Sequence, residues 1–228
     1  MAIERVPNPS AKLSDSDQLI EDSVALFSSV FQTNTATISL VGGDVSLLGA
    51  MVRSMIKAAL VAGGEYYPAL DENDSDELTG YALWLPPGRD LFDTPEQRDL
   101  GFNDFMASLP EAGKRITRTS YVLARKDYSK ESSTFVDECM GGPKGKIDAW
   151  WLLIMVVRPE KQKQGIGRRL IETVKKKATE KGQTLACSTT RDNNVRVYTS
   201  YGFEQKGVKR CLRRGANGHS ESNAIVAR

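Results

Sequence analysis

The 228-residue sequence has a single histidine, His219, and only three cysteines, Cys139, Cys187 and Cys211. The cysteines are odd in number and widely spaced, which fits neither a disulfide framework nor a metal cluster. One histidine near the C-terminal end offers no obvious material for Ser-His-Asp catalysis or for a zinc site. These shortages indicate reduced thiols, chemistry without a metal, and a cytoplasmic location.

Long apolar runs and an excess of one charge are also lacking. No stretch approaches the roughly 18 apolar residues of a membrane span, and the N-terminus has no apolar signal-peptide core. The chain has 31 basic and 29 acidic residues, a net charge of +2, so nothing global demands nucleic acid or an anionic membrane as a partner. Hydrophobic residues at 40% and charged residues at 26% are ordinary for a globular protein. We therefore expect one domain over residues 1–228.

The stretch from Ala149 to Leu170 has a distinct order of patterns. Its nine apolar residues from Ala149 to Val157 predict a strand buried on both faces, although a short apolar run is also compatible with a buried helix. Arg158-Pro159 ends the run. A polar loop and Gly165-x-Gly167 follow. A helix is then predicted, because apolar residues recur at every fourth position: Ile166, Leu170, Val174 and Ala178.

A strand, a glycine turn and a helix can together hold an anion on backbone N–H groups. The first N–H groups of a helix have no partner inside it, and the helix dipole adds about half a positive charge there. Lys161, Lys163, Arg168 and Arg169 crowd this helix start. A solvated basic loop is the alternative. Because an anion with several charges would turn this crowding into attraction, we prefer a phosphate site.

The spacing excludes two familiar phosphate loops. A P-loop needs four residues between its glycines and a following Lys-Ser/Thr, and a dinucleotide fingerprint needs a small residue where Leu170 stands. Instead, Gln162-x-x-Gly165-x-Gly167 resembles the acyl-CoA loop of the GNAT superfamily of N-acetyltransferases. Asn194-x-x-x-Tyr198-x-x-x-Gly202-Phe203 resembles the family's second signature, in an order similar to that of antibiotic-modifying members, the puromycin N-acetyltransferases.

Other patterns predict the remaining elements. Alternating strands and helices indicate an α/β domain. We expect helices over Asp15–Phe31, Asp44–Leu60 (with Asp44 as N-cap) and Val195–Tyr201, irregular helices over Thr94–Met140, and strands over Ile3–Val6, Glu65–Leu70, Leu78–Leu85, Gln183–Ser188, Phe203–Leu212 and Ala224–Val226.

The resemblance implies a GNAT-like α/β (α+β) fold. This is a mixed, mainly antiparallel sheet flanked by helices, whose fourth and fifth strands run parallel and splay apart to admit acyl-CoA. It also implies a CoA-binding core of about residues 147–212 and a variable acceptor-side segment of about residues 86–146.

The same resemblance implies direct transfer of an acetyl group from acetyl-CoA to a primary amine in a ternary complex. Asn194 would bind the pantetheine arm or cap the next helix. Tyr198 would protonate the leaving thiolate or simply pack. The residues expected to hold acetyl-CoA are Met155, Val156, Val157, Gln162, Lys163, Gln164, Gly165, Ile166, Gly167, Arg168, Arg169, Asn194 and Tyr198.

The base that would deprotonate the amine has no clear candidate. Some relatives carry a glutamate on the strand where this chain has Leu185 to Thr190, without a carboxylate. Asp148 and Ser188 are the candidates, with Asp192 and Glu138 as alternatives. An amine that arrives neutral would need no strong base.

Aromatic residues near the two central strands could bind the acceptor. Tyr81, Trp84 and Trp150 are the candidates, and core packing is the alternative for each. Trp150 and Trp151 are adjacent, so we expect one of them to face each side of the sheet.

The preferred acceptor is a small-molecule amine. The first alternative is a protein lysine or N-terminus, for which the acidic run Asp71–Glu77 is the only hint. The second is a catalytically silent acyl-CoA-binding module. A nucleic-acid partner is disfavoured because the basic residues converge on one helix start. The acceptor's identity, the acyl-chain length and the choice between monomer and homodimer stay open.

Overall fold

The structure is a computed structural model, and it describes residues 13–71, 77–117, 136–142, 144–212 and 219–227. A six-stranded sheet runs through it in the order β1-β2-β3-β4-β6-β5. Only β3 and β4 are parallel neighbours, which confirms the mixed, mainly antiparallel sheet. The strands are β1 (Glu65–Leu70), β2 (Leu78–Leu85), β3 (Trp150–Val157), β4 (Leu185–Thr189), β5 (Glu204–Leu212) and β6 (His219–Ala227).

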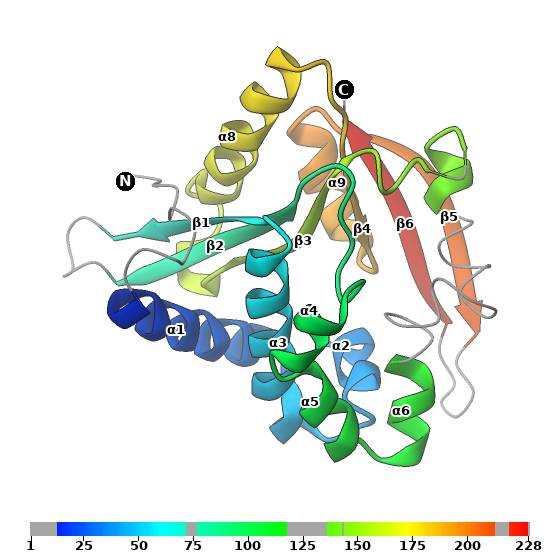
Figure 1. Cartoon of the computed structure of the whole chain (residues 1–228). Helices are drawn as coiled ribbons and strands as arrows, with labels where there is room; N and C mark the ends of the chain where they lie inside the picture. The colour runs from blue at the N-terminus through cyan, green and yellow to red at the C-terminus, as the bar shows by residue number, and fades with distance from the viewer. Residues whose placement is uncertain (1–12, 72–76, 118–135, 143, 213–218, 228) are drawn as a thin grey trace.

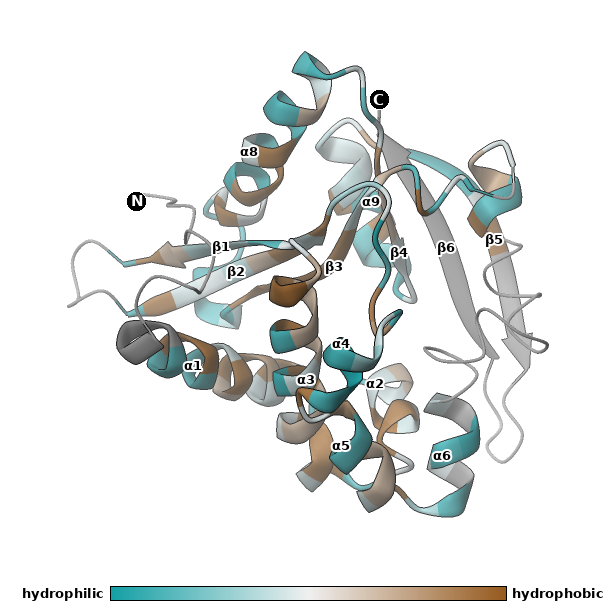
Figure 2. Ribbon diagram, viewed as in Figure 1, coloured by the Kyte–Doolittle hydropathy of each residue, from teal (hydrophilic) through white to brown (hydrophobic). Residues whose placement is uncertain are grey.

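Helices cover both faces of the sheet. In Figure 1, α8 lies on one side of β1–β3, and α1 and α3 lie on the other. Figure 2 shows hydrophobic and hydrophilic bands alternating along α8, as the four-residue period predicted. The helices are α1 (Leu13–Phe31), α2 (Thr35–Leu40), α3 (Leu48–Val61), α4 (Pro95–Asp99), α5 (Phe102–Ser108), α6 (Glu111–Thr117), α8 (Ile166–Glu180) and α9 (Asp192–Ser200), with 3-10 turns η2 (Val45–Leu47) and η5 (Pro159–Lys161).

Local signals placed most of these elements correctly. The bounds of β1 and β2 are those predicted. Asp44 caps the turn η2 through Ser46 N at 3.0 Å, so the helix expected there begins only at Leu48. The short helix α2, capped by Asn34, was not predicted. The strand expected over Ile3–Val6 lies outside the described residues.

A β-bulge interrupts β3. Leu83 pairs with Ile154 and Trp84 with Leu152, which leaves Leu153 as an extra residue. One extra residue reverses the faces to which later side chains point. Trp150 and Leu152 therefore share the α8 side with the later Met155 and Val157, and Trp151 shares the α1 and α3 side with Ile154 and Val156. Along β3, buried and half-buried residues alternate, so the predicted burial on both faces is only partial.

The two parallel strands separate soon after they meet. Trp150 pairs with Leu185 and Trp151 with Ala186, and the described parts of β3 and β4 share no later pair. On its other side, β4 stays paired with β6 through Thr189. The backbone of β3 from the bulge onward is thus open toward β4. This confirms the splayed pair that the resemblance implied.

Gly80 allows β2 to approach β3 closely. A Cβ built at Gly80 would lie 2.7 Å from the carbonyl oxygen of Val156. We expect Gly80→Ala to lower the free energy of unfolding by about 1–3 kcal/mol, because backbone must shift to admit the methyl group.

Gly49→Ala is the matched control. Its Cβ would meet only Val24 Cγ1, at an ordinary 3.5 Å, inside α3. Replacing a helical glycine by alanine in open space stabilises a protein by about 0.5–1 kcal/mol. Urea unfolding of both variants should give opposite signs. Equal and small changes would contradict the close packing at Gly80.

Candidate functional site

The turn between β3 and α8 presents a row of backbone donors. Lys163 has φ 62° and Gly165 has φ 80°, and Gly165 precedes α8 without a side-chain cap. Gln162 N donates to Pro159 O, and Arg169 N donates to Gly165 O at 3.1 Å. Between them, the N–H groups of residues 163–168 donate no hydrogen bond within the described part of the chain. Six consecutive donors at the positive end of a helix are chemically suited to hold an anion.

Side chains of the same loop hold the turn in place. Gln162 Nε2 donates to Val157 O at 3.1 Å, and Gln164 Nε2 donates to Glu160 O at 3.2 Å. Both amides thus support the backbone of the loop rather than projecting toward an anion. Gly167 lies close to α9, since a Cβ on it would be 3.1 Å from Tyr201 Oη and 3.7 Å from Met155 Sδ.

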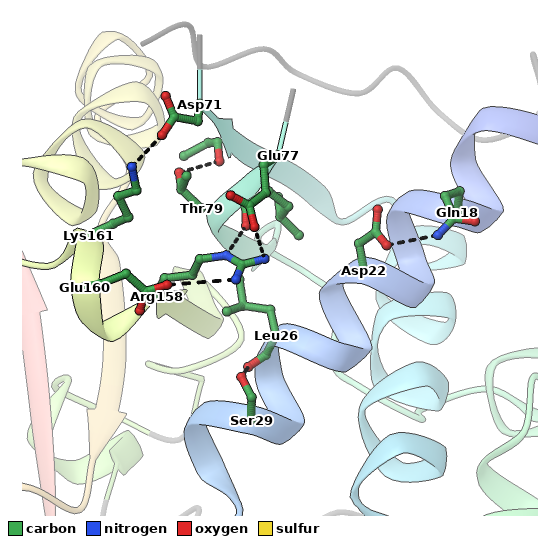
Figure 3. Close-up of polar contacts among 12 residues, drawn as sticks. Gln18, Asp22, Leu26, Ser29, Asp71, Glu77, Thr79, Arg158, Glu160 and Lys161 are labelled. Carbon is green, nitrogen blue, oxygen red and sulfur yellow. Dashed lines mark hydrogen bonds and ion pairs between the residues drawn. The ribbon is translucent and has the colours of Figure 1, made fainter. Parts of the chain in front are cut away.

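Two ion pairs anchor this loop to the ends of β1 and β2 (Figure 3). Lys161 Nζ lies 2.6 Å from Asp71 Oδ2, and the Asp71 side chain is 9% exposed. Arg158 Nε donates to Leu78 O at 2.8 Å, and Arg158 Nη2 lies 2.9 Å from Glu77 Oε1. Asp71 and Glu77, the two ends of the acidic run, therefore neutralise the chain's own cations.

Both arginines at the helix start are engaged by the chain itself: Arg168 bonds to the end of α9, and Arg169 lies beside Gln164 and Gly165. Arg168 donates to Ser200 O at 3.0 Å, and its guanidinium lies 5.1 Å from the centre of the Tyr201 ring. It therefore joins α8 to the C-terminal end of α9, where a cation also suits the helix dipole. Arg169 NH1 donates to Gln164 O at 3.3 Å. Lys163 is exposed and forms no ion pair with any residue that the structure describes.

Tyr198, on α9, lies near the end of β4 that has separated from β3. It is 7% exposed and packs against Phe203 with ring centres 5.6 Å apart. Burial, together with the neighbouring Cys187 and Tyr201, raises the pKa of Tyr198 well above the usual value of a phenol. The hydroxyl therefore keeps its proton at neutral and mildly alkaline pH. Burial also raises the pKa of Cys187, which keeps the thiol neutral and disfavours acyl-cysteine chemistry.

Asn194 ties α9 to the end of β4. Its Nδ2 donates to Thr189 Oγ1 at 3.1 Å. The N-cap of α9 is Arg191, which makes no side-chain cap bond. The alternative reading of Asn194 as a helix cap is therefore wrong.

The aromatic candidates for the acceptor site lie in the core. Tyr81 and Trp84 are both 0% exposed, and they pack on opposite sides of the sheet. Trp150 is buried on the α8 side, where its Nε1 donates to Gln183 Oε1 at 2.8 Å. Trp151 lies half-buried on the other side, so the two tryptophans do face opposite ways. Of the two tryptophans, Trp150 was named as the candidate for the acceptor site, because alternation along the strand does not tell which of them meets which face.

The candidate bases are spread along β3 and β4. Ser188 is exposed, on the face opposite buried Cys187 and two residues beyond Ala186. Asp148 is exposed and precedes β3, at the end where β3 and β4 are still paired. Asp148 and Glu138 line a hollow of about 590 Å³ together with Cys139, Lys144 and Lys206. This placement separates Asp148 from the splayed part of the strands and argues against it as the base.

The described residues contain neither a cluster that could hold a metal ion nor a helix that could cross a membrane. No group of three or more His, Cys, Asp and Glu side chains is placed to hold a metal ion. No described helix is long and apolar enough to cross a membrane.

Comparisons with known proteins agree with this geometry. A family model described as an acetyltransferase (GNAT) domain matches residues 118–205, which include the glycine turn and Tyr198. No curated protein matches the chain. Among solved structures, the Drosophila melanogaster polyamine N-acetyltransferase is 15% identical with a TM-score of 0.62, over 99% of this chain and 98% of that chain.

Two further solved structures have a similar fold. A Corynebacterium glutamicum structure described as histone acetyltransferase HPA2 and related acetyltransferase is 16% identical with a TM-score of 0.59, over 99% of this chain and 96% of its own. Aminoglycoside 6'-acetyltransferase type Ii is 15% identical with a TM-score of 0.50, over the same shares. At these identities the likeness shows the fold alone. The family match over residues 118–205 and the shared fold together confirm the resemblance to the GNAT acetyltransferases.

Proposed function

We propose that this chain is an N-acetyltransferase that moves an acetyl group from acetyl-CoA to a primary amine of a small molecule. The observation that carries the proposal is the row of N–H groups at residues 163–168, placed directly after a strand that splays from its parallel neighbour. The polyamine and aminoglycoside acetyltransferases that share the fold act on small amines, which supports the acceptor class.

In this proposal the glycine turn binds the pyrophosphate of acetyl-CoA. The N–H groups of residues 163–168, including those of Gln164, Ile166, Gly167 and Arg168, would donate to its oxygens, and Lys163 would supply the free cation. Gln162 and Arg169 would act by holding the loop, through their bonds to Val157 O and Gln164 O.

The open edge of β3 would bind the pantetheine arm. Past the bulge, the backbone from Met155 to Val157 has no partner in β4, so its polar groups can bond to the amides of the arm. A backbone N–H there would polarise the thioester carbonyl. The side chain of Val156 is buried in the core, so its contribution would come from the backbone alone. Asn194 would line the opposite wall, beside Thr189.

Tyr198 would be the acid. The amine nitrogen attacks the thioester carbon, a C–N bond forms, the C–S bond breaks, and the leaving sulfur takes the phenolic proton. The tyrosinate is then reprotonated by the proton that the amine releases. An amine that arrives neutral needs no strong base. Ser188, which is exposed on β4, would orient a water molecule near the amine.

We also propose one domain over residues 1–228, because the strand pairs join residues 65–85 to the CoA-binding core in one sheet. A cytoplasmic location is part of this proposal, and the free thiols of Cys139 and Cys187 are compatible with it. Its partners in this proposal are acetyl-CoA and a small amine, without metal, nucleic acid or membrane.

The test is release of CoA thiol from acetyl-CoA, with a panel of small amines and basic peptides, together with thermal protection by CoA. We expect protection and amine-dependent release, with the acetylated amine found by mass spectrometry in equal amount. Release only with peptides would favour the protein acetyltransferase, and protection without release from any acceptor would favour a silent acyl-CoA-binding module. The absence of both would refute the proposed site.

A further inference from the structure

The ammonium group of Lys146 lies in a small cation site. Its Nζ is 2.9 Å from Asp90 Oδ1 and 5.2 Å from the centre of the Trp151 ring. The Lys146 N–H donates to Asp137 Oδ1 at 3.0 Å, which fixes the backbone at this position. The side chains of Lys146 and Asp90 are each 26% exposed, so solvent reaches the pair.

This cation site lies on the α1 and α3 side of the sheet, at the point where β3 and β4 separate. Trp151 pairs with Ala186, the last pair before β3 and β4 separate. Its side chain packs with Ala186, away from the α8 side where Trp150 is buried. Two residues further along β4, Ser188 is exposed. A small molecule that reaches the splayed strands from this face would therefore pass Trp151.

The chemistry of the site suits a cation that does not react. A carboxylate and the face of an indole ring together attract an ammonium group. The same carboxylate favours the charged form of a bound amine, which cannot attack a thioester. An amine held against Asp90 would thus keep its proton while another amine of the same molecule reacts.

We propose that Asp90 and Trp151 form a subsite for a second, non-reacting ammonium group of the acceptor, and that Lys146 occupies this subsite until the acceptor displaces it. The acceptor class is then a diamine or a larger polycation. The proposal rests on the proposed function, because it names the substrate class of the same site.

The test compares 1,4-diaminobutane with butylamine, which lacks the second ammonium group. Asp90→Asn removes the carboxylate charge, and Lys146→Met removes the competing ammonium group while keeping the bulk of the chain. We expect the KM for 1,4-diaminobutane to rise about five- to tenfold in Asp90→Asn and to fall severalfold in Lys146→Met. Changes of this size correspond to one partly exposed charged contact. The KM values for butylamine and acetyl-CoA should stay within about twofold, since neither uses the subsite.

Lys144→Met is the matched control. Lys144 lies on the same segment, is exposed, and forms no ion pair among the residues described. The Lys144→Met variant should leave the KM values for both amines and for acetyl-CoA unchanged. If Lys144→Met acts like Lys146→Met, or if the two amines keep their ratio of KM values in both site variants, the subsite is refuted.

Calorimetry separates failure of the subsite from failure of the enzyme. Binding of each amine to the CoA-saturated protein needs no turnover. Tighter binding of 1,4-diaminobutane, but not of butylamine, to Lys146→Met would support the subsite even if no acetyl transfer were found. If 1,4-diaminobutane binds equally to wild type and to Lys146→Met, or if neither amine binds to any variant, the subsite is overturned. This holds whether or not the protein transfers acetyl groups.

Discussion

Tyr198→Phe should lower kcat by about 100-fold or more and leave the KM for acetyl-CoA nearly unchanged, because a general acid contributes about 10²–10⁴-fold to such a step. The ring stays, so packing against Phe203 is kept. Steady-state kinetics with the best amine from the acceptor panel would measure the change. A loss of less than about threefold would exclude the phenol as the acid.

Tyr66→Phe is the control for the loss of a buried phenol. Tyr66 is buried on the α1 and α3 side, where its hydroxyl lies 2.6 Å from Ser23 Oγ. Its removal should cost about 1 kcal/mol of stability, the usual worth of one hydrogen bond, without changing kcat. The two variants should thus affect different quantities. A fall in kcat in both would indicate a general effect of loosened packing.

The pH profile tests the same role. Because burial raises the pKa of Tyr198, the proton-donating form should persist beyond the ordinary phenol value of about 10. In wild type, ionisation of Tyr198 should therefore cause no fall in kcat below about pH 10. An alkaline decline near pH 8–9 that disappears in Tyr198→Phe would contradict the raised pKa.

Gly165→Ala should weaken acetyl-CoA binding by about 5- to 30-fold, because a left-handed backbone costs an alanine about 1–2 kcal/mol. Gly165 has φ 80° and directly precedes α8. The strained turn would relax in the free protein, and binding would have to restore the alignment of the N–H groups of residues 163–168. Isothermal calorimetry with CoA would measure the loss.

Gly182→Ala separates strain from binding. Gly182 follows the other end of α8 with φ 62°, and nothing lies within 4 Å of a Cβ built there. Gly182→Ala should lose about 1–2 kcal/mol of stability but bind CoA as wild type does. Equal losses of affinity in both variants would mean that the turn at Gly165 has no direct part in binding.

Short-range patterns predicted the strand, the glycine turn and the helix that form the candidate site. They succeeded because proline, glycine and the four-residue apolar period act locally, as at Pro159, Gly165 and Leu170. They could not place the bulge at Leu153, because each residue of that apolar run suits either face of the sheet. No sequence signal indicated which face of the sheet Trp150 meets, and the structure buries it under α8.

Long-range contacts were beyond the reach of the sequence. The four basic residues at the start of α8 predicted an anion site, yet Lys161 pairs with Asp71 and Arg168 bonds to Ser200 O. Both partners are distant in the chain. Likewise, β6 lies between β4 and β5, an order that no local pattern specifies.

The most direct test of the account is a backbone amide spectrum of the labelled protein, recorded during titration with CoA. The account predicts that the amides of residues 163–168 shift most and move downfield, since their N–H groups gain an anionic acceptor. Amides at the far end of α8, around Gly182, should not move. Saturable binding that leaves residues 163–168 unchanged would contradict the anion site, and the proposed enzyme with it.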